Sequence, residues 1–556
     1  MPEIRTATPP SPSLPLDPAT FGALMLLSLP WLTPFSLGPT TSVMPLLVSW
    51  ACAAALAITR TPLHGSASVV QQFSPFAFVF LGAALWRGGW PPGAEVLALG
   101  MSLLAILACA IRFAGARTAD AVVLARGWLL AGLASVLIGW LQYTGIEGAL
   151  APWVSPANLG EAFGNLRQRN LYASLTSIAL CSLLWLARND PWFHRPLRVI
   201  LPAALLAAGN ALSHSRTGLL EILLILGLAG IWGLHRERAA RWALAPVVPA
   251  YLIAAAGLPM LFTAGAQPGI FTRLTEGAAQ CASRMTLWSN VLELIGQKPW
   301  FGWGWGRLDY AHYSELYAGP RFCDILDNAH NLPLQLAVEL GLPVTLFLCG
   351  GALWAAWRAR PWRETDSLRQ LAWAVLAVMG LHSLLEYPLW YGPFQMALGI
   401  CLGLLIPIDP SRTARPWVAV ALSASLLAGI GLAALDYHRA RQIYLPPEER
   451  AAAYRDQTLE KVQQAWIFRD QVRFAELTTT PLDRANAAWT YDLAISLLPF
   501  SPEPRVIEKV VESAVMLGRD QEALLHLARF RAAFPKDHRE WAAGLHTPAT
   551  APEADE

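Results

Sequence analysis

The run 327–331, Asp-Asn-Ala-His-Asn, places one imidazole among amide side chains directly before a long apolar segment. An imidazole exchanges protons near neutral pH and can serve as a general base toward a hydroxyl. Polar side chains at the edge of an apolar span are costly and are commonly functional. We therefore predict that His330 is a catalytic base at a membrane surface. In the alternative interpretation, Asn328 or Asn331 caps the next helix, whose first turn holds Pro333.

Arginines stand in three further polar segments: Arg167 and Arg169 before one apolar span, Arg216 between two spans, and Arg284 in a long loop. The planar guanidinium fork suits bidentate contact with phosphate oxygens. Several such groups together could hold a pyrophosphate at a membrane surface. The alternative is that each arginine reaches separately toward lipid headgroups.

A further polar turn holds His382, Glu386, Tyr387 and Tyr391. The two tyrosines are four residues apart, which would place them on one face of a helix, but Pro388 interrupts regular geometry between them. This pattern favours an irregular segment that lines a cavity over a lipid-facing helix.

The run Gly-Trp-Gly-Trp-Gly at 302–306 offers flat aromatic faces between flexible residues. One interpretation is a platform on which a sugar ring stacks. The other is an aromatic anchor at the membrane interface, where tryptophan is enriched.

Composition identifies the elements that must position these residues. Of 556 residues, 54% are hydrophobic and only 14% are charged, with a mean hydropathy of +0.39; a soluble domain carries about 25% charged residues. The chain is therefore predicted to be an all-α, polytopic membrane protein, and no basic tract suggests nucleic-acid binding. We expect about thirteen spans, over 21–37, 41–58, 73–86, 94–111, 120–143, 171–187, 197–212, 217–234, 242–263, 331–357, 370–386, 390–408 and 416–435.

Arginine placement predicts the orientation, because cytoplasmic loops are enriched in basic residues. One set of alternate loops contains Arg60, Arg112, Arg117, Arg188, Arg195, Arg198, Arg236, Arg238, Arg241, Arg358, Arg360, Arg363, Arg369, Arg412 and Arg415. That set is predicted to be cytoplasmic, as is a retained N-terminal tail over 1–20. Helices over 21–263 and 331–435 would then flank an outward loop, 264–330, and 436–556 would lie on the outer side.

The segment 436–556 differs from the rest, since it holds 19 of the 39 acidic residues. Helical periodicity is expected over 451–468, 481–498, 504–517 and 520–534, with Pro and Gly between. The last two resemble one tetratricopeptide-type helix pair. We predict a small α-helical domain outside the membrane.

The seven cysteines show no metal-ligand spacing, so no metal or other cofactor is expected. Five lie in apolar spans, where packing is the expected role. Cys281 and Cys323 share the 264–330 loop, and a disulfide between them is possible if that loop is extracytoplasmic.

At these residues the chain resembles the O-antigen ligase and polymerase superfamily of Wzy-like, GT-C-type membrane glycosyltransferases. Within it, the chain is similar to the PglL-type bacterial O-linked protein oligosaccharyltransferases. The similarity covers roughly residues 140–540. It is carried by Ser213–Gly218, Arg284–Trp288, Pro299–Gly306, Asp327–Pro333, the run His-Ser-Leu-Leu-Glu-Tyr-Pro-Leu-Trp-Tyr at 382–391, and 468–478.

The resemblance implies a bacterial inner-membrane enzyme with an outward active site. The enzyme would transfer an oligosaccharide from undecaprenyl pyrophosphate to Ser or Thr of a periplasmic or pilin-like protein, without a metal and with inversion. It implies His330 as the essential base, with Arg216 and Arg284 on the pyrophosphate. Gln168 matches a functional glutamine, and either Tyr387 or Tyr391 matches a functional tyrosine. The remaining site candidates are Arg167, Arg169, Glu386, Asn328 and Asn331.

Three other functions compete with this one. An O-antigen ligase would use a lipid A-core sugar as acceptor, and a polymerase would extend the glycan itself. The outward domain 436–556 favours a protein acceptor, because it could serve as a docking module. A transporter of lipid-linked sugar would place ionisable residues near the bilayer midplane and often shows repeats, whereas here polar residues gather at span ends.

Overall fold

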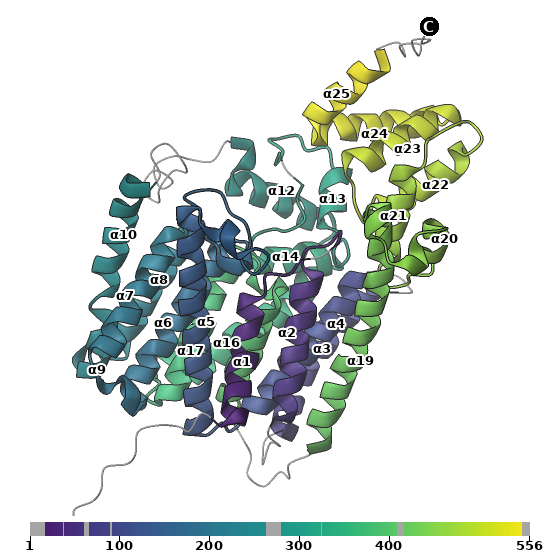
Figure 1. Ribbon diagram of the computed structural model, residues 1–556. Helices are drawn as coiled ribbons and strands as arrows, with labels where there is room; N and C mark the ends of the chain where they lie inside the picture. Colours follow the sequence, from purple (N-terminus) through teal and green to yellow (C-terminus); the bar gives the residue numbers. More distant parts are fainter. Residues whose placement is uncertain are drawn as a thin grey trace, which may run out of the picture. The chain divides into compact units, whose positions relative to one another are not determined.

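The computed structural model describes residues 17–36, 38–59, 66–88, 92–262, 280–323, 325–407 and 416–546. Over these residues the secondary structure is helical and contains no β-strand (Figure 1). Helices satisfy their own backbone hydrogen bonds, which a chain in a bilayer requires. Most of the expected tail, together with Arg60, Arg412, Arg415 and 264–279, lies outside the described residues.

The chain divides into two units, and each boundary that the structure describes falls inside a helix. Unit 1 comprises 1–75, 101–276 and 355–430, and unit 2 comprises 76–100, 277–354 and 431–556. The helices that contain boundaries are α3 (Ser66–Gly88), α4 (Ala94–Phe113), α16 (Gly351–Ala359) and α19 (Pro416–Arg441).

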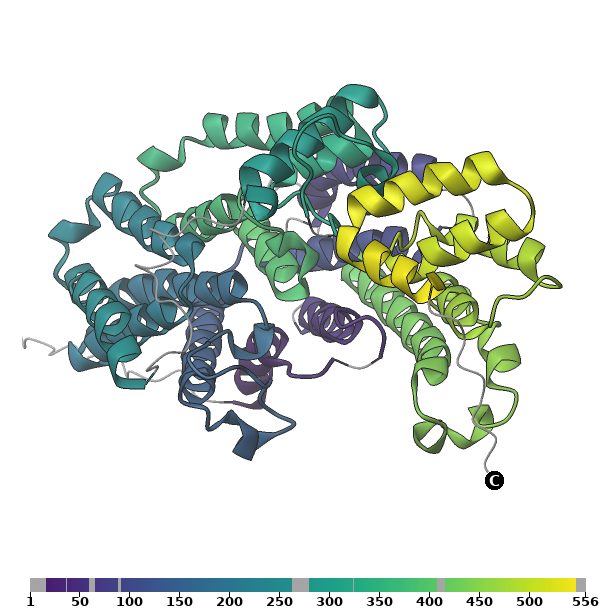
Figure 2. The same ribbon diagram turned by 90° about the horizontal axis from the view of Figure 1, so that it is seen from above.

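Unit 1 is a bundle of apolar helices in which α5, α6, α7 and α8 run side by side (Figures 1 and 2). α6 packs against α5, α7, α8, α9 and α17. Of the 18-residue apolar stretch within α6, 94% is buried inside the protein. Small residues allow this approach: a Cβ on Gly132 of α5 would lie 2.3 Å from Cβ of Ala179 of α6. The helices within this unit are α1 (Pro18–Leu32), α2 (Val43–Ile58), α5 (Thr118–Thr144), α6 (Arg169–Asn189), α7 (Leu197–Leu212), α8 (Arg216–Ile231), α9 (Arg238–Leu244), α10 (Val247–Phe262), α17 (Ser367–Ser383) and α18 (Gly392–Leu405).

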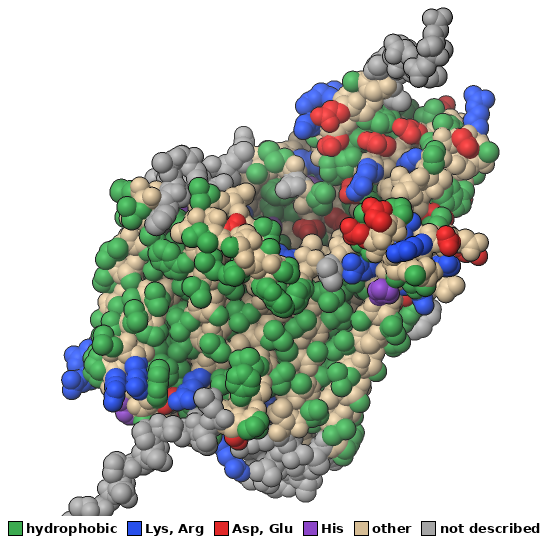
Figure 3. All heavy atoms as spheres, in the orientation of Figure 1, with side chains coloured by type: hydrophobic (Ala, Val, Ile, Leu, Met, Phe, Trp, Pro, Cys, Tyr) green, Lys and Arg blue, Asp and Glu red, His purple; other side chains and the backbone are tan. Residues whose placement is uncertain are grey.

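Seven helical stretches among the described residues are long and apolar enough to cross a membrane: Ser66–Trp86, Ala94–Phe113, Thr118–Thr144, Arg169–Asn189, Arg238–Leu261, Leu342–Arg363 and Trp417–Tyr444. Four shorter helices are also apolar, namely α1, α2, α7 and α18. Hydrophobic side chains form a broad surface over the bundle, and Lys and Arg gather at its α9 end (Figure 3). The chain is therefore a polytopic membrane protein. α3 is longer than the predicted span 73–86.

The predicted span 331–357 is not one helix, and this expectation was wrong. α14 (Leu332–Leu340) ends before Gly341, and the chain resumes as α15 (Leu342–Thr345), a π-helical turn at 346–350, and α16. Gly341 has φ of 88°, and a Cβ there would lie 2.3 Å from the carbonyl oxygen of Trp300. Only glycine fits such a contact without strain, so the close approach of the 300 segment breaks the helix.

The part of unit 2 that precedes α16 also contains two helices from the predicted loop, α12 (Arg284–Gln297) and α13 (Leu308–Ser314). Leu287, Val291 and Leu294 of α12 pack in one core with Leu308 of α13 and Val338 of α14. The described part of the predicted loop, from residue 280 on, therefore contains packed helices, although its polarity alone predicts only an extramembrane segment.

The C-terminal part of unit 2 is a small helical domain with acidic and basic side chains on its surface (Figure 3). α22 packs on α23, and α23 on α24, around a core that includes Val506, Val510 and Phe530. Tyr313 of α13 joins this core, and its hydroxyl lies 2.8 Å from Nδ1 of His526. The helices are α20 (Thr458–Val462), α21 (Arg469–Thr479), α22 (Ala487–Leu497), α23 (Pro504–Met516), α24 (Asp520–Ala533) and α25 (Pro535–His546).

The predicted helix 451–468 is also wrong. That stretch forms a 3₁₀ turn at 452–454, the short α20 and an irregular end made of turns and bends. The carboxylate of Asp436, at the end of α19, accepts the backbone N–H groups of Ile467 at 2.8 Å and Phe468 at 3.0 Å. Those N–H groups would otherwise take part in a helix, so a tertiary contact overrides the local helical preference.

Acidification is expected to loosen the packing of α13 on α24. Burial, with a smaller effect of Arg529, lowers the pKa of His526 to about 4, whereas an unfolded histidine titrates near 6.5. The stability from the neutral imidazole is therefore complete above about pH 6.5 and declines as pH falls toward 4, with a loss of roughly 1–2 kcal/mol at pH 5. Hydrogen exchange of α22–α24 in the full chain at pH 7 and pH 5 measures this loss.

The matched control is His526→Gln, which cannot titrate in this range. Its protection, corrected for intrinsic exchange rates, should change less between the two pH values than that of the wild type. Equal protection of the wild type at pH 7 and pH 5 would contradict a buried neutral His526.

Candidate active site

The predicted site residues fall into two groups, one in each unit. Gln168, Arg216, Glu386, the neighbouring arginines and the two tyrosines belong to unit 1, while Arg284, His330 and the two asparagines belong to unit 2. Each group is built by its own helices and short-range contacts.

In unit 1, three segments far apart in sequence meet through Asn170, at the start of α6. The Ser215 hydroxyl, before α8, donates to Oδ1 of Asn170 at 2.6 Å. Nδ2 of Asn170 donates to Oε1 of Glu386, in the turn after α17, at 3.0 Å. Glu386 is buried, with 6% of its surface exposed. These bonds join the ends of α6, α8 and α17 into one polar layer, which we call the site layer (Asn170, Ser215, Glu386).

Arg216 is the first residue of α8, directly after the site-layer serine. Ser215 caps the helix by accepting from the backbone N–H of Gly218 at 3.0 Å. Arg216 is exposed, whereas Ser215 and Thr217 on either side are buried. Its guanidinium and the positive helix end both favour an anion, so the arrangement is suited to phosphate oxygens.

Arg167, Gln168 and Arg169 have local partners. Gln168 caps α6, because its side-chain oxygen accepts from Leu171 N at 2.7 Å. Arg167 has φ of 58°; it donates to the carbonyl oxygen of Pro34 and, at 3.3 Å, to the Ser155 hydroxyl. Arg169 pairs with Glu161 at 3.4 Å. Fixing the start of α6 is therefore a structural role for all three residues.

Tyr387 and Tyr391 lie on an irregular turn, as predicted. Residues 388–390 form a 3₁₀ turn, and Tyr391 N donates to the carbonyl oxygen of Pro388 at 3.0 Å. The two tyrosine rings stack with centroids 6.1 Å apart at an interplanar angle of 26°. Both rings are half-buried, so the pair presents one aromatic surface next to Glu386.

In unit 2, α12 connects Arg284 with the histidine segment. Ser283 caps α12 by accepting from Thr286 N at 3.2 Å, which makes Arg284 its first residue. Trp288, one turn later on the same helix face, donates through Nε1 to the carbonyl oxygen of Ala329 at 3.1 Å. α12 thereby sets the spacing between Arg284 and the 329–331 backbone.

His330 occupies a constrained position. Its φ is 48°, a left-handed conformation that few residues other than glycine adopt and in which asparagine, aspartate and histidine are enriched. Its N–H donates to Oδ1 of Asn328 at 2.9 Å, and Gln335 accepts from Ala329 N at 2.7 Å. The imidazole is half-buried. Such strain is found where the surroundings over-determine a functional residue.

Asn331 is the N-cap of α14, since its side chain accepts from Leu334 N at 3.1 Å. Pro333 stands in the first turn, so the capping interpretation is correct for Asn331. Asn328 holds the backbone of His330 instead. Asn328 therefore positions the histidine directly, Asn331 fixes the start of the helix that follows it, and His330 itself is not the cap.

The Gly-Trp-Gly-Trp-Gly run packs against the end of α14, and the two predicted roles, a sugar platform and an interfacial anchor, stay predictions. Trp303 N donates to the carbonyl oxygen of Val338 at 2.8 Å, and a Cβ on Gly302 would lie 2.3 Å from the carbonyl oxygen of Glu339. Nε1 of Trp303 donates to the carbonyl oxygen of Leu294 at 3.0 Å. Trp305 is buried against Phe80. The glycines permit this approach, and the Trp305 indole is buried whereas the Trp303 indole is half-buried.

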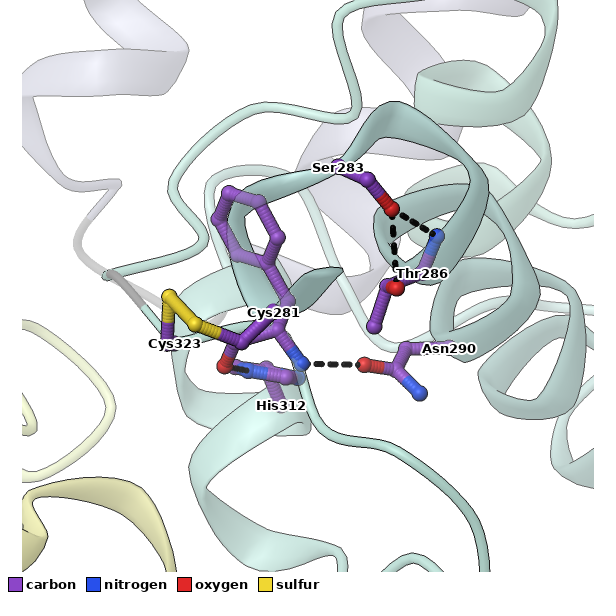
Figure 4. Close-up of a disulfide and its surroundings, with 7 residues drawn as sticks. Cys281, Ser283, Thr286, Asn290, His312 and Cys323 are labelled. Atoms are coloured by element: carbon purple, nitrogen blue, oxygen red, sulfur yellow. Dashed lines mark hydrogen bonds between the residues drawn. A yellow bond between two sulfur atoms is a disulfide. The ribbon is translucent and has the colours of Figure 1, made fainter. Parts of the chain in front are cut away.

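Cys281 and Cys323 form a disulfide, which the sequence left open (Figure 4). Close to it, Asn290 of α12 accepts from Phe322 N at 2.8 Å, and Nε2 of His312 lies 3.3 Å from the carbonyl oxygen of Phe322. The disulfide therefore fastens the irregular segment around Cys323 to the 3₁₀ turn just before α12. Burial, with a smaller effect of Arg321, lowers the pKa of His312 to about 3, so this imidazole is neutral.

Reduction of the disulfide is expected to loosen the segments that hold Arg284 and His330 in unit 2. A crosslink over 42 residues contributes about 2–4 kcal/mol, so dithiothreitol should increase proteolysis within 280–323 and lower any activity that requires Arg284 and His330. The Cys281→Ser/Cys323→Ser variant is the control, since it should match the reduced wild type and not respond to reductant. Unchanged proteolysis of the reduced wild type would contradict this role.

The sequence did not indicate which residues hold the site together. Asn170, Ser215, Trp288 and Gln335 make the linking hydrogen bonds. A partial signal was present, because Arg284 and Trp288 are four residues apart on one helix. Nothing in the sequence signalled the bond between residues 170 and 386.

Three family models match parts of the chain. Residues 162–187 match a protein glycosylation ligase model, residues 201–349 match an O-antigen ligase model, and residues 370–546 match the C-terminal model of a virulence factor membrane-bound polymerase. The chain is 27% identical over 334 residues to a general O-oligosaccharyltransferase of Acinetobacter baylyi, covering 55% of each chain. It is 24% identical over 255 residues to a ComP-specific O-oligosaccharyltransferase of the same organism, covering 44% of each.

The chain thus aligns with about half the length of the curated relatives it matches. The matched segments contain the predicted site residues: Gln168 in the first, Arg216, Arg284 and His330 in the second, and Glu386 to Tyr391 in the third. The resemblance expected from the short motifs is confirmed.

Proposed function

We propose that this chain, which is similar to the Wzy-like O-antigen ligases and to the PglL-type protein glycosylation ligases, is an O-oligosaccharyltransferase of that superfamily. It transfers a glycan from undecaprenyl pyrophosphate to Ser or Thr hydroxyls of a periplasmic or pilin-like protein. The observation that carries the proposal is the order of the three matches, which spans the candidate residues in both units. Both Acinetobacter baylyi relatives are named O-oligosaccharyltransferases.

In the proposed reaction, the acceptor oxygen attacks the anomeric carbon on the face opposite the pyrophosphate. The new carbon–oxygen bond forms as the bond to the leaving phosphate oxygen breaks, and His330 takes the hydroxyl proton. Arg216 and Arg284 neutralise the charge that grows on the pyrophosphate, and each such contact contributes about 3 kcal/mol. The configuration is inverted, and the residues of the protein supply positioning and charge.

The remaining candidates have supporting roles in this proposal. Tyr387 and Tyr391 present a stacked aromatic surface for the glycan or acceptor, and Glu386 fixes the turn that carries them. Gln168, Arg167 and Arg169 shape the start of α6 near Asn170. Asn328 holds the backbone of His330 in its left-handed conformation, and Asn331 caps the helix that begins directly after it.

We propose thirteen membrane crossings with a cytoplasmic N-terminus in the bacterial inner membrane. Segments 264–330 and 436–556 would then lie in the periplasm, the latter as a docking domain for the acceptor protein. The Cys281–Cys323 disulfide supports this orientation, because such bonds persist in oxidising compartments. Arginine at the α9 end agrees with a cytoplasmic side there.

Expression with an undecaprenyl-linked glycan, candidate acceptor proteins and lipid A-core tests the proposal. Glycan on Ser or Thr of a protein is the expected product. Glycan on lipid A-core would favour an O-antigen ligase. The match of residues 201–349 to an O-antigen ligase model is consistent with that alternative. Longer glycan chains on the lipid carrier would favour a polymerase, as the match over 370–546 would suggest.

A further inference from the structure

A second polar layer lies within unit 1, in the same three segments that form the site layer. We call it the buried triad (Ser174, Glu221, His382). Ser174 follows Asn170 by four residues on α6, and His382 precedes Glu386 by four residues at the end of α17, so each pair is one helical turn apart. Glu221 lies on α8, which begins directly after Ser215.

The buried triad is connected inside the protein. Oγ of Ser174 lies 2.6 Å from Nδ1 of His382, and the Ser174 hydroxyl donates to Oε1 of Glu221. Nδ1 of His382 and Oε1 of Glu221 are 4.0 Å apart, and both side chains are 0% exposed. Ser174 thus bridges an acid and an imidazole, and each of the three helices contributes one partner.

Stability alone does not account for such a group. Replacing a buried ionic pair by apolar side chains of similar volume is often neutral or stabilising, and ionisable residues inside a membrane protein are costly. The triad is too deeply buried to touch a substrate. Its effect must therefore pass through the residues to which it is joined.

His382 joins the triad to the site layer through the backbone as well. Its carbonyl oxygen accepts from Leu385 N at 2.9 Å and from Glu386 N at 2.8 Å, where α17 gives way to the turn at 384–391. The imidazole contacts the edge of Phe394 on α18, with ring centroids 5.9 Å apart. A shift of α17 by one residue, about 1.5 Å, would break the contact with Ser174 and displace Glu386.

We propose that Ser174, Glu221 and His382 are positioning residues that fix the register of α6, α8 and α17, and thereby the placement of Arg216 and Glu386. The effect on catalysis rests on the proposed function, whereas the effect on helix register does not. Reactive groups displaced by about 1 Å can lose roughly 10²-fold in rate. The hydrogen-bonding shape of the triad, rather than its charge, is what sets the register.

The test compares an apolar triad, Ser174→Ala/Glu221→Leu/His382→Phe, with Glu221→Gln, which keeps an oxygen for Ser174. The apolar variant should fold with an unchanged or higher Tm, yet its kcat should fall roughly 10²-fold with KM for the lipid-linked donor within about threefold. Glu221→Gln should retain kcat within a few-fold. Ser423→Ala is the matched control, since Ser423 bonds to the Ala54 carbonyl oxygen between helices that carry no site residue.

A readout independent of activity separates this inference from the proposed function. Spin labels at Leu220→Cys on α8 and Leu384→Cys after α17, both exposed positions, should give a narrow distance distribution in the wild type and in Glu221→Gln. The distribution should broaden or shift in the apolar variant. An unchanged distribution there, wild-type kcat in the apolar variant, or a Glu221→Gln enzyme as slow as the apolar variant would overturn the positioning role.

Discussion

Replacing His330 by Asn is expected to lower glycan transfer roughly 10²–10⁴-fold, the usual contribution of a general base. Asparagine suits this position because it tolerates the left-handed conformation that His330 adopts, with φ of 48°. It therefore removes the imidazole without adding the backbone strain that Ala would introduce. Transfer is measured as the rate of glycan appearance on an acceptor protein, with purified enzyme at equal concentration.

Three comparisons make this prediction specific. His330→Ala should be as slow as His330→Asn and, in addition, less stable. His194→Ala removes an exposed histidine in the loop between α6 and α7 and should leave the rate unchanged. Transfer by His330→Asn at close to the wild-type rate would reject His330 as the base.

Replacing Arg284 by Lys is expected to slow transfer about 10–100-fold, because an ammonium keeps the charge but loses the bidentate fork. The helix should survive, since Ser283 still caps α12 and lysine and arginine have similar helix propensities. The loss should appear in kcat/KM for the lipid-linked donor, with little change in KM for the acceptor protein.

Arg505→Lys is the matched control, because Arg505 is 65% exposed on the C-terminal domain. Arg216→Lys should resemble Arg284→Lys, since both arginines are the first residues of capped helices. A wild-type kcat/KM in Arg284→Lys would show that this guanidinium does not contact the pyrophosphate.

Helices were predicted correctly from the sequence where a single physical effect determines them. The long apolar helices α5 and α6 were located because hydropathy alone is enough to indicate a membrane-spanning helix. Predictions failed where a contact with a segment distant in sequence determines the backbone conformation. Hydropathy continues across Gly341, but the Trp300 segment interrupts the helix there. The 451–468 stretch has a helical pattern, but the backbone N–H groups of Ile467 and Phe468 at its end donate hydrogen bonds to the Asp436 carboxylate.

At the site, the residue types could be predicted from the sequence, but their hydrogen-bonding partners could not. His330 was singled out as an isolated imidazole, and its left-handed backbone and its hydrogen bond to Asn328 emerge only in three dimensions. Asn170 and Glu386 are 216 residues apart, and no local pattern relates them. The packing of the 302–306 run against the end of α14 also has no local signal, because a tryptophan pattern does not distinguish an interface from a packed core.

The most direct test of the account is transfer by the purified chain reconstituted in liposomes. The reaction contains an undecaprenyl-pyrophosphate-linked oligosaccharide, an acceptor protein and a chelator, and intact-mass and peptide mass spectrometry follow the product. The acceptor is expected to gain the mass of the oligosaccharide on Ser or Thr with wild-type enzyme and not with His330→Asn. Equal modification by both enzymes, or glycan joined only to other glycan or to lipid A-core, would contradict it.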